Sequence, residues 1–313
     1  MYHPTQQFPT PEQHAGRRLD NVLTSLLPNV PKSRIHQMIR SGEVRINKSR
    51  CKSHSRLNTG DIIRIPPYFS EEKAASPTPR NEHLNRLKQA ILFEDEYLLA
   101  INKPNGTAVH GGTGIRLGLI ETIRHVPKWQ QAELAHRLDR DTSGCLLIAK
   151  KPQILKALHD AFRHHQVTKR YVALVHGQWP NRQRTIDLPL LRYTAANGER
   201  FVKVHPEGKP SITHFQILSA NAHASALSIR LETGRTHQIR VHCKHANHPI
   251  LGDQKYTDTQ PFPHDTTLNN QLYLHAYSLS FKHPKTNQTL RLSAPLPESF
   301  LNASQQLNIP FKL

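Results

Sequence analysis

Apolar residues near the start of the chain recur with the spacing of an amphipathic helix. Five of them follow the i, i+3, i+4, i+7, i+8 pattern: Leu19, Val22, Leu23, Leu26 and Leu27. This spacing predicts one helix with a single apolar stripe. A second helix is expected to begin at Pro31 and to stop at Gly42. Its inward positions are Ile35, Met38 and Ile39.

Two strand-like segments follow, in which apolar and polar residues alternate. The apolar positions are Val44, Ile46, Ile63 and Ile65, with basic side chains between them. Each strand should bury one face and expose the other. Residues 16–67 are therefore expected to form a small α/β module whose polar surface is cationic.

The segment after this module lacks apolar periodicity and is rich in Pro, Ser and charged residues, and we assign residues 68–83 as a linker. Residues 84–313 alternate short apolar runs with turn residues. The runs are 97–102, 145–149, 171–177, 226–232, 272–281 and 290–292. Strands outnumber clear helices such as Ile154–Arg163. The expected fold class is therefore α+β, with a mainly antiparallel mixed sheet and flanking helices in the second domain.

Charge narrows the choice of partner. The chain has 42 Lys and Arg against 23 Asp and Glu, a formal net charge of +19, which indicates a polyanion such as nucleic acid or an anionic membrane surface. No apolar run approaches the length of a membrane span, and neither a secretory leader nor a CxxC pair is visible. We expect a cytoplasmic protein without disulfides and without a membrane partner.

Two polar clusters are candidates for chemistry. HRLDRDTSG (136–144) precedes an apolar strand, and TGRTHQIRVH (233–242) follows one, where Gly234 would allow a sharp turn. One interpretation is an exposed loop whose Arg and Asp residues pair with each other. Another is a metal-dependent nuclease that uses Asp139 and Asp141, although the neighbouring Arg residues would oppose metal binding.

At these positions the sequence resembles the RluA-type pseudouridine synthases, and within them the branch that acts on 23S ribosomal RNA. The other matching segments are NKPNGTAVHGG (102–112), KRYVALVHG (169–177), KPSITHF (209–215), HPILGDQKY (248–256) and LHAYSLSFKHP (274–284). The basic module resembles the small RNA-binding domain first named in a small-subunit ribosomal protein. The resemblance implies an enzyme that converts uridine to pseudouridine in RNA, and this isomerisation needs no cofactor and no metal.

The resemblance also implies roles for individual residues. Asp139 would be the catalytic carboxylate, acting either as nucleophile at the sugar or as base at the ribose 2′ position. Arg235 would pair with Asp139, Tyr171 would pack on the target base, and Arg137 would fill the gap left when the uridine is extruded. Phosphate contacts are expected from further basic residues: Lys32, Arg34, Arg45, Lys48, Arg140, Lys169 and Arg240.

Several alternatives stay open. The basic module alone would also suit a catalytically silent ribosome-binding RNA chaperone, whereas the set Asp139, Tyr171 and Arg235 favours an enzyme. A related synthase could act on other ribosomal or transfer RNA uridines. His242, His245 and His248 superficially resemble a metal site, but no acidic group stands nearby in the sequence. We expect a monomer.

Overall fold

The computed structural model describes residues 1–27, 29–70, 79–111, 117–257, 268 and 271–313. The chain divides into two compact units, Met1–Ser76 and Pro77–Leu313. This boundary falls inside the predicted linker, of which residues 71–78 lie outside the described part. No helix in the described residues is long and apolar enough to cross a bilayer.

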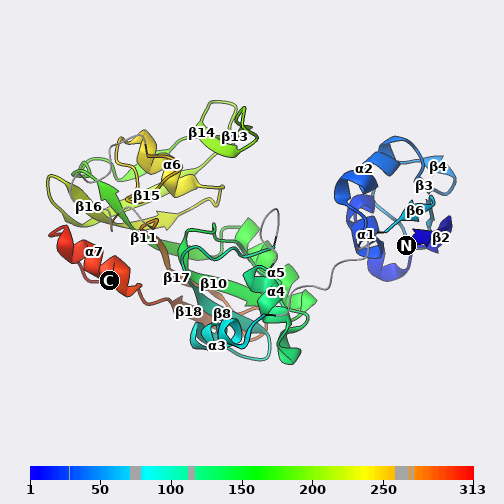
Figure 1. Ribbon diagram of the computed structural model, residues 1–313, viewed down its shortest axis with the longest axis horizontal. Helices are drawn as coiled ribbons and strands as arrows, with labels where there is room; N and C mark the ends of the chain where they lie inside the picture. The colour runs from blue at the N-terminus through cyan, green and yellow to red at the C-terminus, as the bar shows by residue number, and fades with distance from the viewer. Residues whose placement is uncertain (28, 71–78, 112–116, 258–267, 269–270) are drawn as a thin grey trace. The chain divides into compact units, whose positions relative to one another are not determined.

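The first unit packs two helices, α1 (Leu19–Leu26) and α2 (Lys32–Arg40), beside a small sheet (Figure 1). The sheet order is β2 (Gln6–Pro9), β5 (Ile62–Ile65), β3 (Arg45–Ile46), β4 (Ser49–Arg50). The helices bury the positions that the apolar spacing indicated, including Leu19, Leu23, Ile35 and Met38. A 3-10 turn covers Glu12–His14.

The first unit extends beyond the predicted boundaries of 16 and 67. Strand β2 precedes residue 16, and β1 (Tyr2–His3) pairs with β6 (Tyr68–Phe69). Helix α3 (Asn81–Gln89) begins before residue 84. The assigned linker is therefore too long at both ends, because short strands and a polar helix leave little apolar periodicity to detect.

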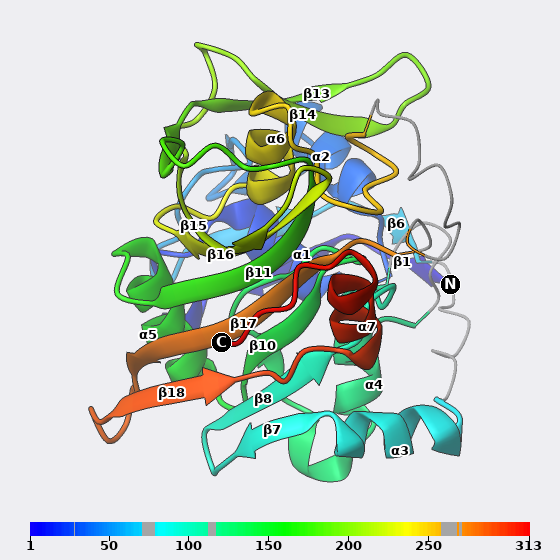
Figure 2. The same ribbon diagram turned by 90° about the vertical axis from the view of Figure 1, so that its left-hand side faces the viewer.

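The second unit is built on one mixed sheet with the order β12, β15, β16, β11, β17, β10, β8, β7, and Figure 2 shows most of it as stacked ribbons. The pair β10–β17 is parallel and the other pairs are antiparallel, as expected from the sequence. Strand β9 adds to β10, and β18 adds to β17. The bounds are β7 Ile91–Glu94, β8 Leu98–Lys103, β9 Glu133–Leu134, β10 Ser143–Ala149, β11 Thr168–His176, β12 Thr185–Asp187, β15 Ile212–Ala220, β16 Ala224–Leu231, β17 Leu274–Lys282 and β18 Thr289–Ser293.

Helices and a hairpin complete the second unit. The helices are α4 (Leu119–Arg124), α5 (Pro152–Arg163), α6 (Gln238–His245) and α7 (Glu298–Gln306), with a 3-10 turn at Pro127–Trp129. The hairpin of β13 (Leu190–Thr194) and β14 (Arg200–Val204) lies beside α6 (Figure 2).

Strand β10 is buried along its whole length, and it holds the end of the loop that contains Asp139. Leu147 and Ala149 join the cluster that includes Ile154 and Leu158 of α5. Gly144, where β10 meets β17, has φ +110, and a Cβ there would lie 2.3 Å from the carbonyl oxygen of Ala276. Only glycine allows this close approach. The loop that leads into β10 is thus anchored at its end by the sheet.

Candidate active site

Two cavities share one wall in the second unit. The first, of about 730 Å³, is lined by the 135–142 loop, the end of α5, the start of β11 and residues 231–240. The second, of about 680 Å³, lies toward the 252–255 turn and the β13–β14 hairpin. Four residues line both cavities: Arg137, Asp139, His237 and Arg240. The two polar clusters that the sequence singled out therefore meet at this wall.

The loop that carries Asp139 is held by buried polar contacts. Lys103, at the end of β8, is fully buried and its ammonium donates to the carbonyl oxygens of Pro104, Thr107 and Arg140 at 2.8–2.9 Å. Burial lowers the pKa of Lys103 to about 7, while the charges of Asp141 and Asp139 act in the opposite direction. Three accepting carbonyls match the three ammonium donors, so this side chain fixes the loop.

His136 ties the same loop to the sheet. Its Nε2 accepts the backbone N–H of Leu147 in β10 at 3.0 Å. Burial, with a smaller effect of Lys169, lowers the pKa of His136 to about 4. The neutral imidazole is therefore the form that fits here, because a proton on Nε2 would break this hydrogen bond.

Asp139 is partly accessible, with 22% of its side chain exposed. Its Oδ2 lies 3.8 Å from Nε2 of His237, and it borders both cavities. Arg240 also lines both cavities, and its own pKa reflects the charge of Asp139. Burial alone would lower the pKa of Arg240, but the hydrogen bonds and charge of Asp253, together with Asp139, raise it above its usual value. The carboxylate thus stands beside a cation that stays charged.

Two expectations about arginines need correction. Arg235 is exposed and its Nε donates to the carbonyl of Pro210 at 3.1 Å, and no ion pair joins it to Asp139 in the described residues. Arg240 was expected to bind phosphate, yet only 6% of its side chain is exposed and it forms a bidentate pair with Asp253. The cation beside Asp139 is therefore Arg240, and Arg235 is an exposed residue that lines the first cavity.

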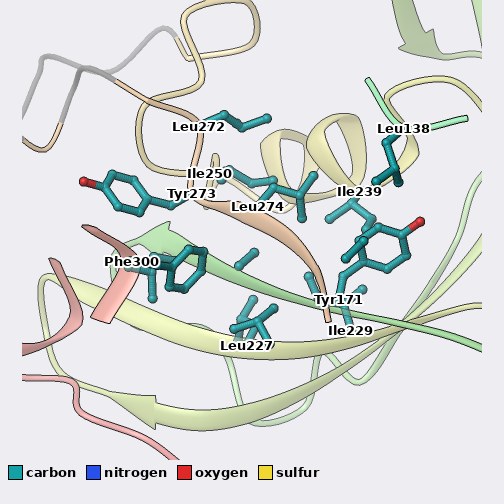
Figure 3. Close-up of a cluster of buried hydrophobic side chains, with 14 of the residues drawn as sticks. Leu138, Tyr171, Leu227, Ile229, Ile239, Ile250, Leu272, Tyr273, Leu274 and Phe300 are labelled. Atoms are coloured by element: carbon teal, nitrogen blue, oxygen red, sulfur yellow. The ribbon is translucent and has the colours of Figure 1, made fainter. Parts of the chain in front are cut away.

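Tyr171, in β11, combines a buried ring with access to the first cavity. Its ring joins the main apolar cluster, and Figure 3 shows it near Leu138 and Ile239 with its hydroxyl pointing away from the other side chains. Burial, followed by the charge of Asp139, raises the pKa of Tyr171 well above its ordinary value. The phenol is neutral at physiological pH and presents an aromatic surface to the cavity.

The remaining basic residues differ in their accessibility. Arg137 is exposed, and within the described parts of the chain its side chain has no hydrogen-bond or ion-pair partner. Arg140 pairs with Asp141 at 3.0 Å, and burial, with the charge of Arg235, lowers the pKa of Lys169. In the first unit Lys32 and Lys48 are exposed, Arg34 contacts Glu43, and Arg45 donates to the carbonyls of Gly42 and Lys48.

The histidines near residue 245 do not form a metal site in the described residues, where no three His, Cys, Asp or Glu side chains gather around a common point. His242 is engaged at both ring nitrogens, by Thr213 and by the carbonyl of Leu188. His248 contacts the carbonyl of His176. These rings have structural partners within the second unit.

Three residues at the site were not singled out from the sequence: His237, Asp253 and Tyr256. Nδ1 of His237 lies 2.6 Å from Oη of Tyr256, and Asp253 holds Arg240. All three stand inside motifs quoted above, but nothing in a linear pattern shows that residues 237–240 and 253–256 meet in space.

Comparisons with known proteins identify the family of the chain. The RNA pseudouridylate synthase family matches residues 97–245, and the S4 domain matches residues 17–63. The human protein "RNA Pseudouridylate Synthase Domain Containing 4" superimposes with a TM-score of 0.61 at 26% identity, covering 73% of this chain and 97% of its own. The chain belongs to the RNA pseudouridylate synthase family, and it carries an N-terminal S4 domain.

Its relatives include proteins named "Ribosomal large subunit pseudouridine synthase C". The protein of Pasteurella multocida is 47% identical, with 91% of this chain and 88% of the relative covered. The Haemophilus influenzae protein is 46% identical, covering 95% and 93%. The Escherichia coli K12 protein is 44% identical, covering 94% and 93%. The family and fold class expected from the sequence are confirmed.

Proposed function

We propose that this pseudouridine synthase isomerises uridines of 23S, large-subunit ribosomal RNA, with Asp139 as the carboxylate that begins the reaction. The substrate assignment rests on the names of the relatives, which match more than nine-tenths of the chain at 44–47% identity. A formal charge of +19 suits a polyanionic substrate. We further propose that the protein works as a monomer in the cytoplasm, which sedimentation at the mass of one chain, 35.7 kDa, would support.

The reaction constrains what the site must supply. The bond between N1 of uracil and C1′ of ribose breaks, a bond between C5 and C1′ forms, C5 loses a proton and N1 gains one. Asp139 either attacks C1′ or removes the 2′ proton, so a single carboxylate suffices. One observation supports this role for Asp139. It is the one acidic side chain among the described residues lining the first cavity.

The surroundings of Asp139 suit a flipped nucleotide. The buried ring of Tyr171 offers a flat surface on which the uracil can pack. The charged guanidinium of Arg240 stands near the carboxylate of Asp139, and Arg137 stands exposed where it can enter the vacated stack. The cavity also presents other cations to the RNA backbone: Arg163, Lys169, Arg192 and Arg235.

The decisive experiment replaces Asp139 by Asn and follows tritium release from 23S rRNA labelled at C5 of uridine. Turnover should fall at least about 10²-fold, because the amide can act neither as nucleophile nor as base. RNA binding should persist, since the distributed cations are unchanged. Asp141→Asn is the matched control, because Asp141 pairs with Arg140 at the surface. Turnover of Asp139→Asn near that of the parent protein would refute the assignment.

The substrate is tested in cells. Pseudouridines should disappear from defined positions of 23S rRNA when the gene is deleted, and should return with the parent protein but not with Asp139→Asn. If pseudouridines disappear only from small-subunit rRNA or transfer RNA, the proposed large-subunit substrate is wrong. The proposed chemistry at Asp139 would still hold.

A further inference from the structure

His237 connects the catalytic wall to a tyrosine on another segment. Its Nδ1 lies 2.6 Å from Oη of Tyr256, and the backbone N–H of Val202 in β14 donates to the same oxygen at 3.1 Å. Burial is the main cause that raises the pKa of Tyr256 to about 12, so the phenol keeps its proton. Because Val202 occupies a lone pair of Oη, the hydroxyl proton is available to His237.

This contact suits one tautomer of His237. When Nδ1 accepts the hydroxyl proton, a neutral imidazole must carry its own proton on Nε2. Nε2 is the atom that faces Oδ2 of Asp139, at 3.8 Å. Burial lowers the pKa of His237, and the charges around the ring come from Asp139, Arg240, Lys255 and Asp253. In this tautomer a neutral ring carries its N–H on the nitrogen nearest to the carboxylate of Asp139.

The backbone of His237 supports a functional role. Its φ of 52° and ψ of 21° place it in the left-handed region, immediately before α6. Residues other than glycine seldom adopt this conformation, although asparagine, aspartate and histidine do so more often than the rest, and such residues concentrate at functional sites. His237 also lines both cavities. The left-handed residue at the start of α6 is thus also a residue that lines the site.

We propose that His237 is a positioning residue for the reaction: it directs an Nε2 proton at Asp139, with Tyr256 fixing the tautomer. The distance of 3.8 Å exceeds a hydrogen bond, and such contacts commonly tighten when substrate enters a site. The bond would orient Oδ2 and leave Oδ1 free to act at the ribose. This inference rests on the proposed role of Asp139.

The test compares two replacements of His237. One keeps a hydrogen-bond donor at the position of Nε2, and the other suits the left-handed backbone better. The Gln amide nitrogen stands three bonds from Cβ, as Nε2 of His does, so His237→Gln keeps a donor toward Asp139. His237→Asn places its amide at the position of Nδ1, but Asn tolerates the left-handed conformation better. If His237 positions Asp139, His237→Gln should retain about tenfold more kcat than His237→Asn, with similar RNA affinity. A purely structural role predicts the reverse order.

Tyr256→Phe provides a second variant that leaves the His237 backbone untouched. It keeps the ring, which packs against Phe201 and Arg240, and removes only the hydroxyl. Single-turnover tritium release from 23S rRNA should slow about tenfold with unchanged RNA affinity. Equal single-turnover rates in the parent and Tyr256→Phe, or His237→Asn at least as active as His237→Gln, would overturn the positioning role.

Two controls in the same assay separate this inference from the proposed function. The parent protein must release tritium and Asp139→Asn must not. If either control fails, the proposed substrate or the role of Asp139 is at fault. If both hold and the order of the His237 variants is reversed, only the positioning role is lost. Thermal unfolding of every variant shows whether a change in kcat follows stability instead.

Discussion

Arg240 and Asp253 form a bidentate ion pair, with Nε–Oδ2 at 2.8 Å and Nη2–Oδ1 at 2.6 Å, and 6% and 1% of their side chains are exposed. Oδ1 of Asp253 also accepts the backbone N–H groups of Lys255 and Tyr256. A single carboxylate thus positions both the cation beside Asp139 and the turn that carries Tyr256.

Breaking this pair should destabilise the second unit strongly. Asp253→Asn leaves the guanidinium of Arg240 buried without its counterion, a change that costs about 3–5 kcal/mol. The control is Asp160→Asn, which removes the partner of exposed Arg163 and should cost less than about 1 kcal/mol. Urea unfolding measures both free energies. Equal losses would mean that solvent reaches Arg240 in the folded protein.

Acid should destabilise the second unit through histidines whose pKa is lowered in the folded chain, three of them strongly. Burial is the main cause that lowers the pKa of His136, His242 and His275 to about 4, below the ordinary value of 6.5. Between pH 6.5 and 4 the unfolded chain therefore binds more protons than the folded one. The free energy of unfolding should fall with decreasing pH by up to about 1.4 kcal/mol per pH unit for each histidine.

One substitution checks the origin of this slope. His275→Gln keeps polar atoms near Ser143 and Ala294, the partners of both ring nitrogens, but cannot take up a proton. The slope of the unfolding free energy against pH should decrease by up to about 1.4 kcal/mol per pH unit, the contribution of one histidine. His223→Gln, at an exposed position, should leave the slope unchanged. An unaltered slope in His275→Gln would mean that His275 does not contribute to the acid sensitivity.

The S4 domain should contribute affinity without catalytic groups. The two units have separate apolar cores, so a fragment of residues 81–313 should fold and keep the Asp139 site. If Lys32, Arg34, Arg45 and Lys48 each neutralise one phosphate, the slope of log affinity against log salt should decrease by about 3 in the fragment. Filter binding to 23S rRNA at several salt concentrations measures this. The same slope in fragment and full chain would exclude phosphate contacts from the S4 domain.

Periodic apolar segments made much of the fold predictable. The helix expected over 19–27 is observed at Leu19–Leu26, and the one expected at Ile154–Arg163 begins two residues earlier, at Pro152. The strand expected at 145–149 spans Ser143–Ala149. These elements bury one face or both, so their sequence carries the period of the structure.

The sequence could not show whether Arg235 or Arg240 is the cation beside Asp139. Gly234 was expected to make the turn after β16, yet it is not among the glycines with positive φ, and the left-handed residue is His237. This turn starts α6 at Gln238 and buries Arg240 against Asp253, thirteen residues away. Neither a left-handed residue nor a carboxylate thirteen residues away produces a periodic pattern in the sequence. The pairing of Arg240 with Asp253 could therefore be seen only in the tertiary structure.

Arg137 should support extrusion of the target uridine more than the isomerisation itself. It is exposed on the wall that both cavities share, with no side-chain partner in the described residues, and its planar guanidinium suits stacking on exposed bases. Extrusion from folded RNA costs a few kcal/mol, whereas an unstructured strand requires little unstacking. Arg137→Ala should therefore slow turnover on structured 23S rRNA about 10–100-fold more than on a short unstructured oligonucleotide with the same target.

The neighbouring Arg140→Ala is the matched control for this prediction. Arg140 is equally part of the loop, but its side chain pairs with Asp141 and lines only the second cavity. Its removal should weaken binding to both substrates to a similar extent, as expected when one phosphate contact is lost. Single-turnover rates on the two RNAs, measured at saturating enzyme, separate chemistry from affinity. Equal losses of rate on both RNAs for Arg137→Ala would mean that this arginine acts on the bound nucleotide and not on its extrusion.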